Sequence, residues 1–174
     1  LVLLPPHMDR YKQISDKARG IYARYTDRIE SFGIDECWLD VTGNGRLWGE
    51  NYGEVIANEI RCAVKSELGV TVSVGVSFNK IFAKMGSDYK KPDATTEITR
   101  ENVRDILYPM PVEDLLFVGH SSAQLLRSRG ITTIGMLAEC NRDTLVQWLG
   151  KQGEGLWRMV NGEDHSPVRR WGEQ

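Results

Sequence analysis

The sequence lacks the features that mark secreted, membrane-spanning or zinc-binding proteins. Its three cysteines, Cys37, Cys62 and Cys140, are widely spaced and form no CxxC pair. An odd number of scattered cysteines argues against a disulfide framework or a structural zinc site, and it predicts a reducing, cytoplasmic location. No apolar run approaches the roughly 20 residues that span a bilayer, since Pro5 and Pro6 follow the short apolar opening. We therefore expect no membrane partner.

An excess of positive charge is absent as well. Lys and Arg total 22 against 24 for Asp and Glu, which leaves a formal net charge of −2. Domains that bind nucleic acid are usually basic, so any such surface here must be local. The hydrophobic fraction of 41% is enough to bury a core. The length allows one medium domain or a larger domain with a small companion.

The first part of the chain alternates helical and strand patterns. Apolar residues spaced by three and four predict helices, and runs rich in β-branched residues predict strands. The predicted ranges are a helix at 9–28, two strands within 29–42, a helix at 52–69, a strand at 70–76, a helix at 79–88 capped by Ser77, and a strand at 95–98. This order predicts an α+β domain with helices packed on an antiparallel or mixed sheet.

Strand patterns stop after Ile98. Thr99 is a predicted helix cap, and Pro109 and Pro111 mark a boundary. Short helical patterns separated by glycines follow at residues 112–117, 122–129, 133–139, 142–149 and 154–161. We therefore expect a small all-α domain over residues 111–174, whose last residues begin a linker.

Two adjacent carboxylates, Asp35 and Glu36, lie between β-rich flanks in the segment S-F-G-I-D-E-C-W-L-D-V-T at residues 31–42. A strand, turn and strand would hold both at an exposed rim. Mg²⁺ prefers oxygen ligands, and paired metals held by carboxylates suit in-line phosphoryl transfer. Taken alone, however, an Asp–Glu pair is more often a solvated acidic turn.

The most basic segment reads S-V-G-V-S-F-N-K-I-F-A-K-M-G-S-D-Y-K-K-P at residues 73–92. It contains several lysines and only one acidic residue, Asp88, and its lysines follow a predicted strand. A lysine in this place could hold a triphosphate as a point charge. Taken alone, an ordinary solvated helix face is the commoner explanation.

Together, the order and the residues of these two segments resemble the palm of the Y-family, or lesion-bypass, DNA polymerases, especially the bacterial DNA polymerase IV-like group. Those palms read approximately S-I-D-E-A-(Y/F)-L-D-(V/L)-T, then S-(V/I)-G-I-(A/S)-x-N-K-x-x-A-K-x-A-S-D-x-x-K-P-x-G. Residues 1–25 resemble the family's V-x-x-P-P-x-x-x-x-Y-x-x-x-S passage. Residues 115–139 resemble its thumb, with L-x-x-(L/V)-x-G and G-I-x-T-I-G-x-L-A. The resemblance covers essentially the whole chain.

The resemblance implies an α+β fold with two domains. The first is a palm over residues 1–110, with a βαββαβ-like sheet that lacks its first strand. The second is a small all-α thumb over residues 111–174, with a helix-hairpin-helix-like motif. In the family, the first palm strand and the fingers come earlier in the chain and a little-finger domain comes later. We expect these parts to lie outside this sequence.

The resemblance also implies site residues. Asp35 matches a carboxylate that binds both catalytic metals, and Glu36 matches one that holds the metal at the primer 3′-hydroxyl. Both are therefore predicted to be catalytic and metal-binding, with two Mg²⁺ ions in the complete active site. Lys91 matches a lysine that contacts the triphosphate of the incoming nucleotide. Asp40 fits a strand-end carboxylate better than a metal ligand.

The sequence departs from the family pattern at two places that bear on binding. The thumb hairpin is predicted to grip DNA phosphates through backbone N–H groups at Gly119, His120 and Ser121, but a second glycine is usual where Ser121 stands. Asp93 and Ala94 replace the usual Asn-Gly pair, which leaves the turn after the nucleotide-binding lysine open to question.

The implied function is the addition of deoxynucleotides to a primer 3′-end opposite damaged template bases, an activity of DNA repair. The implied partners are primer–template DNA and deoxynucleoside triphosphates, with a sliding clamp as a further candidate through segments outside this sequence. With two of the family's three carboxylates, the chain alone is predicted to be inactive. One alternative is a non-catalytic Y-family-derived module that binds DNA or a partner. Another is a different palm-bearing enzyme such as a nucleotide cyclase, which would not explain the helical thumb.

Overall fold

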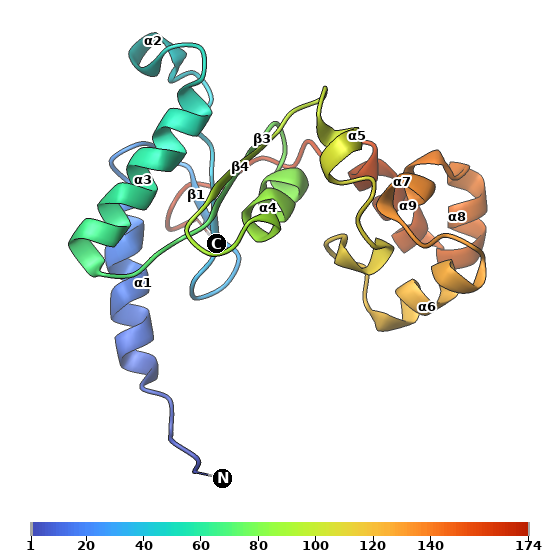
Figure 1. The fold of residues 1–174 in the computed structure, drawn as a ribbon, viewed down its shortest axis with the longest axis horizontal. Helices are drawn as coiled ribbons and strands as arrows, with labels where there is room; N and C mark the ends of the chain where they lie inside the picture. The colour runs from blue at the N-terminus through green and yellow to red at the C-terminus, as the bar shows by residue number, and fades with distance from the viewer. Residues whose placement is uncertain (1, 174) are drawn as a thin grey trace. The chain divides into compact units, whose positions relative to one another are not determined.

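The computed structural model describes residues 2–173 as two compact units (Figure 1). The first unit takes in the described residues up to Val74, residues 90–95 and those from Pro167 onward, and the second takes residues 75–89 and 96–166. This division does not fall at residue 110, and the assignment of a palm and a thumb stays a prediction. None of the described helices is long and apolar enough to cross a membrane.

Two long helices dominate the first unit. α1 (Met8–Tyr22) and α3 (Tyr52–Leu68) run side by side in Figure 1 and pack against each other. The contact is made by the C-terminal end of α1, where Ile21 and Tyr22 are buried, and by one face of α3, whose buried residues are spaced by three and four. The buried core of this unit consists of Ile21, Tyr22, Ile29, Ile56, Ile60 and Val64.

A β-hairpin lies between these helices in the sequence. β1 (Ile29–Ser31) pairs antiparallel with β2 (Cys37–Leu39), with Ile29 opposite Leu39 and Ser31 opposite Cys37. Buried Ile29 and half-buried Leu39 pack into the core of the first unit. The short helix α2 (Gly45–Trp48) then leads to α3. The predicted strand pair is confirmed.

The second strand pair consists of β3 (Val74–Ser77) and β4 (Thr95–Ile98), with α4 (Lys80–Tyr89) between them in the chain. α4 packs very closely on this pair, because a Cβ on Gly75 would lie 1.8 Å from the carbonyl oxygen of Ala83. The α4 residue Gly86 faces the same contact, since its own Cβ would lie 3.2 Å from the Gly75 Cα. Glycine at both positions therefore permits the close approach of helix and strand.

Helices make up the described part of the chain after β4. Their ranges are α5 (Val103–Ile106), the 3₁₀ turn η1 (Val112–Asp114), α6 (His120–Ser128), α7 (Ile134–Glu139), α8 (Arg142–Leu149) and α9 (Lys151–Val160). Between residues 99 and 173 the structure contains no strand, only an isolated bridge between Pro111 and Thr133. The fully buried side chains here include Leu126, Ile134, Leu137, Leu145 and Leu156. The predicted loss of strands after Ile98 is confirmed.

In place of one continuous sheet, the described strands form two two-stranded sheets. Backbone hydrogen bonds link only the hairpin partners and the two strands that flank α4. The mixed α and β composition is as predicted, and the pairing is more divided than predicted.

Several predicted element ends were wrong, including those of the helix predicted at 112–117, which is only the 3₁₀ turn η1, and of the helix predicted at 154–161, which begins at Lys151. α1 was predicted to run to about residue 28 and ends at Tyr22; the Thr26 hydroxyl that follows donates a hydrogen bond to the carbonyl of Asp40 at 2.6 Å. The strand predicted from residue 70 begins at Val74, where a partner strand is available. Asn79 caps α4 through the Phe82 N–H at 2.8 Å, while the predicted cap, Ser77, donates its hydroxyl to the Ile98 carbonyl.

Candidate active site

The β1–β2 hairpin presents the two adjacent carboxylates at its turn. The Phe32 N–H donates to the Glu36 carbonyl at 2.9 Å, which closes the loop between the strands. Within this loop Asp35 is exposed and Glu36 is half-buried. Behind them, the rings of Phe32 and Trp38 pack with their centroids 4.6 Å apart. The hairpin loop therefore carries two consecutive acidic residues, one exposed and one half-buried.

Two side chains of α1 bind the backbone just before the carboxylates. The Arg19 guanidinium donates to the Gly33 carbonyl at 3.0 Å and to the Ser15 hydroxyl, and Ser15 in turn donates to the Ile34 carbonyl. The Arg19 side chain is only 13% exposed. These contacts fix the chain on the N-terminal side of Asp35. Sequence reasoning assigned no role to Ser15 or Arg19, although their spacing of four residues along a helix places them on one face.

The side chains behind the turn are structural. Burial raises the pKa of the Cys37 thiol to about 11, with the Arg19 charge acting in the opposite direction, so this cysteine behaves as a small hydrophobic group. Partial burial favours a raised pKa for Asp40, but hydrogen bonds from Thr42 and the nearby Arg28 charge outweigh it and lower the pKa. Asp40 Oδ1 accepts the Thr42 N–H at 2.9 Å. This geometry agrees with the predicted role of Asp40 as a strand-end carboxylate.

The donor chemistry of the turn fits hard divalent cations. Asp35 and Glu36 offer only carboxylate oxygens, which are the ligands that Mg²⁺ prefers. Across residues 2–173, no cluster of three or more His, Cys, Asp or Glu side chains is arranged to hold a metal ion. The role of Asp35 and Glu36 as metal ligands therefore stays a prediction.

Lys91 lies in the exposed turn between α4 and β4. The Lys91–Pro92 peptide bond is cis, and Asp93 has a φ of +51°. The Ala94 carbonyl accepts the Val74 N–H at 2.8 Å. Asp93 thus adopts the left-handed conformation that short polar residues tolerate better than most.

The predicted DNA-binding residues lie at the start of α6. Gly119 is the N-cap residue, and His120 and Ser121 form the exposed first turn. The preceding loop is tied to α9 by Gln152, whose amide donates to the Phe117 carbonyl at 3.3 Å and accepts the Ser122 hydroxyl at 3.2 Å. The N–H groups of a first helical turn have no partner within the helix, so this end can bind an anion.

Both the sequence and the fold of this chain are similar to those of DNA polymerases. It is 52% identical over 170 residues to the DNA polymerase IV of Acetivibrio thermocellus, a match that covers 98% of this chain and 42% of that relative. Its fold matches the crystal structure of DinB from Sulfolobus solfataricus with a TM-score of 0.84 and 27% identity, over 97% of this chain and 50% of that one. It also matches a Y-family DNA polymerase chimera with a TM-score of 0.85 and 26% identity, over 98% of this chain and 50% of that one.

These likenesses define the class of the chain, which is that of the Y-family DNA polymerases. The chain belongs to the impB/mucB/samB family, whose model matches residues 1–88. It spans less than half the length of its Acetivibrio relative. The matched residues include the acidic hairpin turn and end within α4.

Proposed function

We propose that the protein containing this sequence is a lesion-bypass DNA polymerase, which adds deoxynucleotides to a primer 3′-end. The observation that carries the proposal is the hairpin loop that carries the consecutive acidic residues Asp35, which is exposed, and Glu36, which is half-buried. The 52% identity to a DNA polymerase IV supports it.

In this mechanism the hairpin carboxylates organise an in-line displacement. The primer 3′-oxygen attacks the α-phosphate of the incoming nucleotide, and pyrophosphate leaves. Asp35 and Glu36 would hold two Mg²⁺ ions together with a carboxylate from outside this sequence, and the bound ions would stabilise the attacking and leaving oxygens. Ser15 and Arg19 keep the turn in place through the Gly33 and Ile34 carbonyls.

Lys91 and the start of α6 have separate binding roles in this proposal. Lys91 offsets the negative charge of the triphosphate, because an ammonium acts as a compact point charge for phosphate groups. Gly119, His120 and Ser121 offer N–H groups to the phosphates of the primer–template duplex, a contact that does not depend on base sequence. The two described sheets would then belong to a palm and the helices after residue 110 to a thumb.

The test is primer extension by an extended chain, defined as residues 1–174 joined on both sides to the flanking segments of the Acetivibrio thermocellus polymerase. We expect Mg²⁺-dependent extension by this chain and none by residues 1–174 alone, because two carboxylates leave the metal site short of a ligand. Asp35→Ala or Glu36→Ala should lower the rate by several orders of magnitude and leave the fold intact. The measurement is single-turnover extension, with circular dichroism as the check of folding.

Asp40→Asn in the same extended chain is the matched control. It removes a neighbouring carboxylate charge that binds the Thr42 backbone, so it should lower stability slightly and leave extension measurable. Full activity of Asp35→Ala would overturn the mechanism. An extended chain that binds DNA but never extends it would instead favour a non-catalytic Y-family-derived module.

A further inference from the structure

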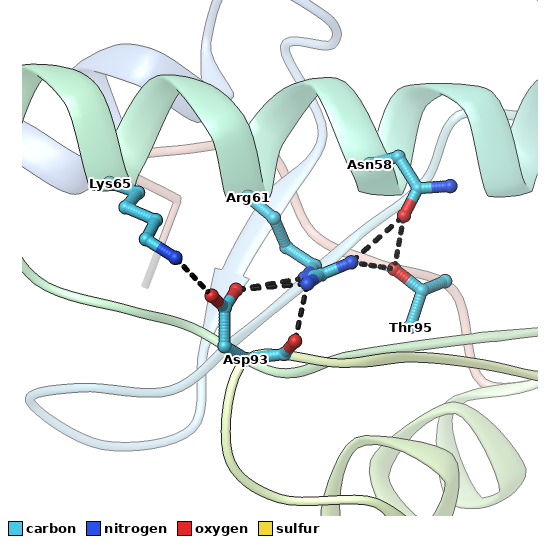
Figure 2. Close-up of polar contacts among 5 residues, drawn as sticks. All are labelled: Asn58, Arg61, Lys65, Asp93 and Thr95. Carbon is cyan, nitrogen blue, oxygen red and sulfur yellow. Dashed lines mark hydrogen bonds and ion pairs between the residues drawn. The ribbon is translucent and has the colours of Figure 1, made fainter.

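A polar cluster joins α3 to the turn that carries Lys91 (Figure 2). We call it the Arg61 cluster, and its members are Asn58, Arg61, Lys65, Asp93 and Thr95. The first three members project from one face of α3, because they are separated by three and four residues. The last two flank Ala94: Asp93 lies in the turn before β4, and Thr95 is the first residue of β4. All five belong to the same compact unit.

Arg61 is the centre of this cluster. Its Nε and Nη2 atoms donate to Asp93 Oδ1 at 3.2 and 2.9 Å, and Nη2 also donates to the backbone carbonyl of Asp93. Its Nη1 atom donates to Asn58 Oδ1 at 3.0 Å and to the Thr95 hydroxyl oxygen at 3.3 Å. One guanidinium thus binds both the side chain and the main chain of the turn.

The remaining contacts close the cluster. Lys65 Nζ lies 2.8 Å from Asp93 Oδ2, and the Thr95 hydroxyl donates to Asn58 Oδ1 at 2.8 Å. Hydrogen bonds from Lys65 and then Arg61 lower the pKa of Asp93, so its carboxylate is charged at neutral pH. Arg61 and Asp93 are 22% and 23% exposed, whereas Lys65 is 63% exposed. The better-shielded pair is the one that also binds the backbone.

We propose that Arg61 and Asp93 are positioning residues, which hold the turn so that Lys91 meets the triphosphate of the incoming nucleotide. Asp93 lies two positions after Lys91 and has a left-handed backbone, which is uncommon for a non-glycine residue even though aspartate tolerates it better than most. Arg61 supports this conformation by binding the Asp93 carbonyl and carboxylate together. This inference rests on the proposed polymerase function.

A second ion pair on α3 provides a matched control. Arg24 and Glu67 form a two-pronged pair with both N–O distances at 2.6 Å, and Glu67 lies on α3, near its C-terminal end. Neither Arg24 nor Glu67 belongs to the Arg61 cluster, so Glu67→Gln removes a charge pair from the same helix and leaves the contacts of Arg61 with the turn in place. A general weakening of α3 would appear in both variants, and a loss of turn geometry would appear only in Arg61→Ala.

The kinetic test uses the extended chain. Arg61→Ala should raise the apparent KM for the incoming nucleotide about tenfold, in line with the loss of charge-assisted hydrogen bonds, while the affinity for primer–template DNA stays unchanged. Arg61→Lys keeps the charge, but an ammonium cannot reproduce the several hydrogen bonds of the planar guanidinium. It should therefore restore only part of the apparent affinity for the incoming nucleotide. Glu67→Gln should match the unmodified chain. An unchanged nucleotide KM in Arg61→Ala would overturn the proposal.

A double-mutant cycle separates positioning from plain stabilisation. If Arg61 acts through Lys91, then Arg61→Ala should add little to the KM of a Lys91→Ala chain. Additive effects would show that Arg61 acts on its own and would also overturn the proposal.

Hydrogen exchange of residues 1–174 gives a readout that does not need activity. Arg61→Ala should speed exchange of the peptide that spans residues 90–96 and leave α8 and α9 unchanged, because the loosening is local. Unchanged exchange in the turn would contradict the positioning role even in an active polymerase. Faster exchange together with an inactive extended chain would overturn the proposed polymerase function and the nucleotide role of Lys91, while the structural role of Arg61 would stand.

Discussion

Single side chains hold the candidate site through contacts to backbone carbonyls. Arg19 binds the Gly33 carbonyl beside the acidic turn, and Arg61 binds the Asp93 carbonyl beside Lys91. A guanidinium suits both positions, because its planar set of donors can bind several acceptors at once. In each case the arginine lies on a long helix, and the residue with a predicted role in chemistry lies on the turn that it binds.

Tyr22, in the core of the first unit, should make the stability of the chain depend on pH. Burial and, to a smaller extent, the neighbouring Cys37 raise the pKa of Tyr22 to about 12 from a usual value of 10.0, while the Arg19 charge acts in the opposite direction. The folded state therefore holds this proton more tightly than the unfolded state does. Its contribution to stability is complete below pH 10 and is lost as the pH rises to about 12.

We expect the free energy of unfolding to fall by on the order of 2 kcal/mol across this window from Tyr22 alone. Tyr22→Phe should remove that part of the fall, because phenylalanine has no proton to lose. Denaturant titrations at several alkaline pH values would measure it. Tyr11→Phe, on the exposed side of the same helix, is the control and should leave the pH dependence unchanged. Identical alkaline profiles for the original chain and Tyr22→Phe would refute the prediction.

Among the elements, close packing of α8 and α9 depends on a glycine. A Cβ on Gly153 would lie 2.1 Å from the carbonyl oxygen of Leu145, which belongs to the backbone of α8 and cannot move aside cheaply. Gly155, on the same helix, has no neighbouring atom within 4 Å of the corresponding position. The two glycines therefore form a matched pair within one helix.

Gly153→Ala should destabilise the chain by about 2–3 kcal/mol, because the two helices must separate to admit a methyl group. Gly155→Ala should stabilise it by about 0.5–1 kcal/mol, since alanine favours a helix where space is free. Urea denaturation followed by circular dichroism would measure both. Equal changes in the two variants would show that helix propensity, and not the α8–α9 contact, decides the outcome.

At the scale of the whole molecule, the charge balance limits DNA binding. A net charge of −2 leaves few cations to neutralise phosphates, so we expect residues 1–174 to bind a primer–template duplex weakly and without preference for base sequence. The affinity should fall with salt, because each neutralised phosphate contributes about 0.9 to the slope of log K against log salt. Fluorescence anisotropy with two unrelated duplexes at several salt concentrations tests this. A strong preference for one duplex, or an affinity independent of salt, would contradict it.

The sequence by itself determined those features of the fold and of the candidate site that depend on local residue patterns. β4 and α8 begin and end at the predicted residues, and the hairpin places Asp35 and Glu36 between two strands as predicted. These features follow from residue spacing, β-branched content and glycine or proline breaks, all of which act over a few neighbouring residues. The resemblance to a polymerase family depended on the same local segments.

Only the tertiary structure decided which distant residues meet. Arg61 and Asp93 are 32 residues apart, and Arg19 and Gly33 are 14 apart, so no local pattern pairs them. The Thr26 hydroxyl likewise binds the carbonyl of Asp40, 14 residues further along the chain. The physical reason is that a hydrogen bond depends on distance in space, and the folding of the helices onto the turns sets that distance.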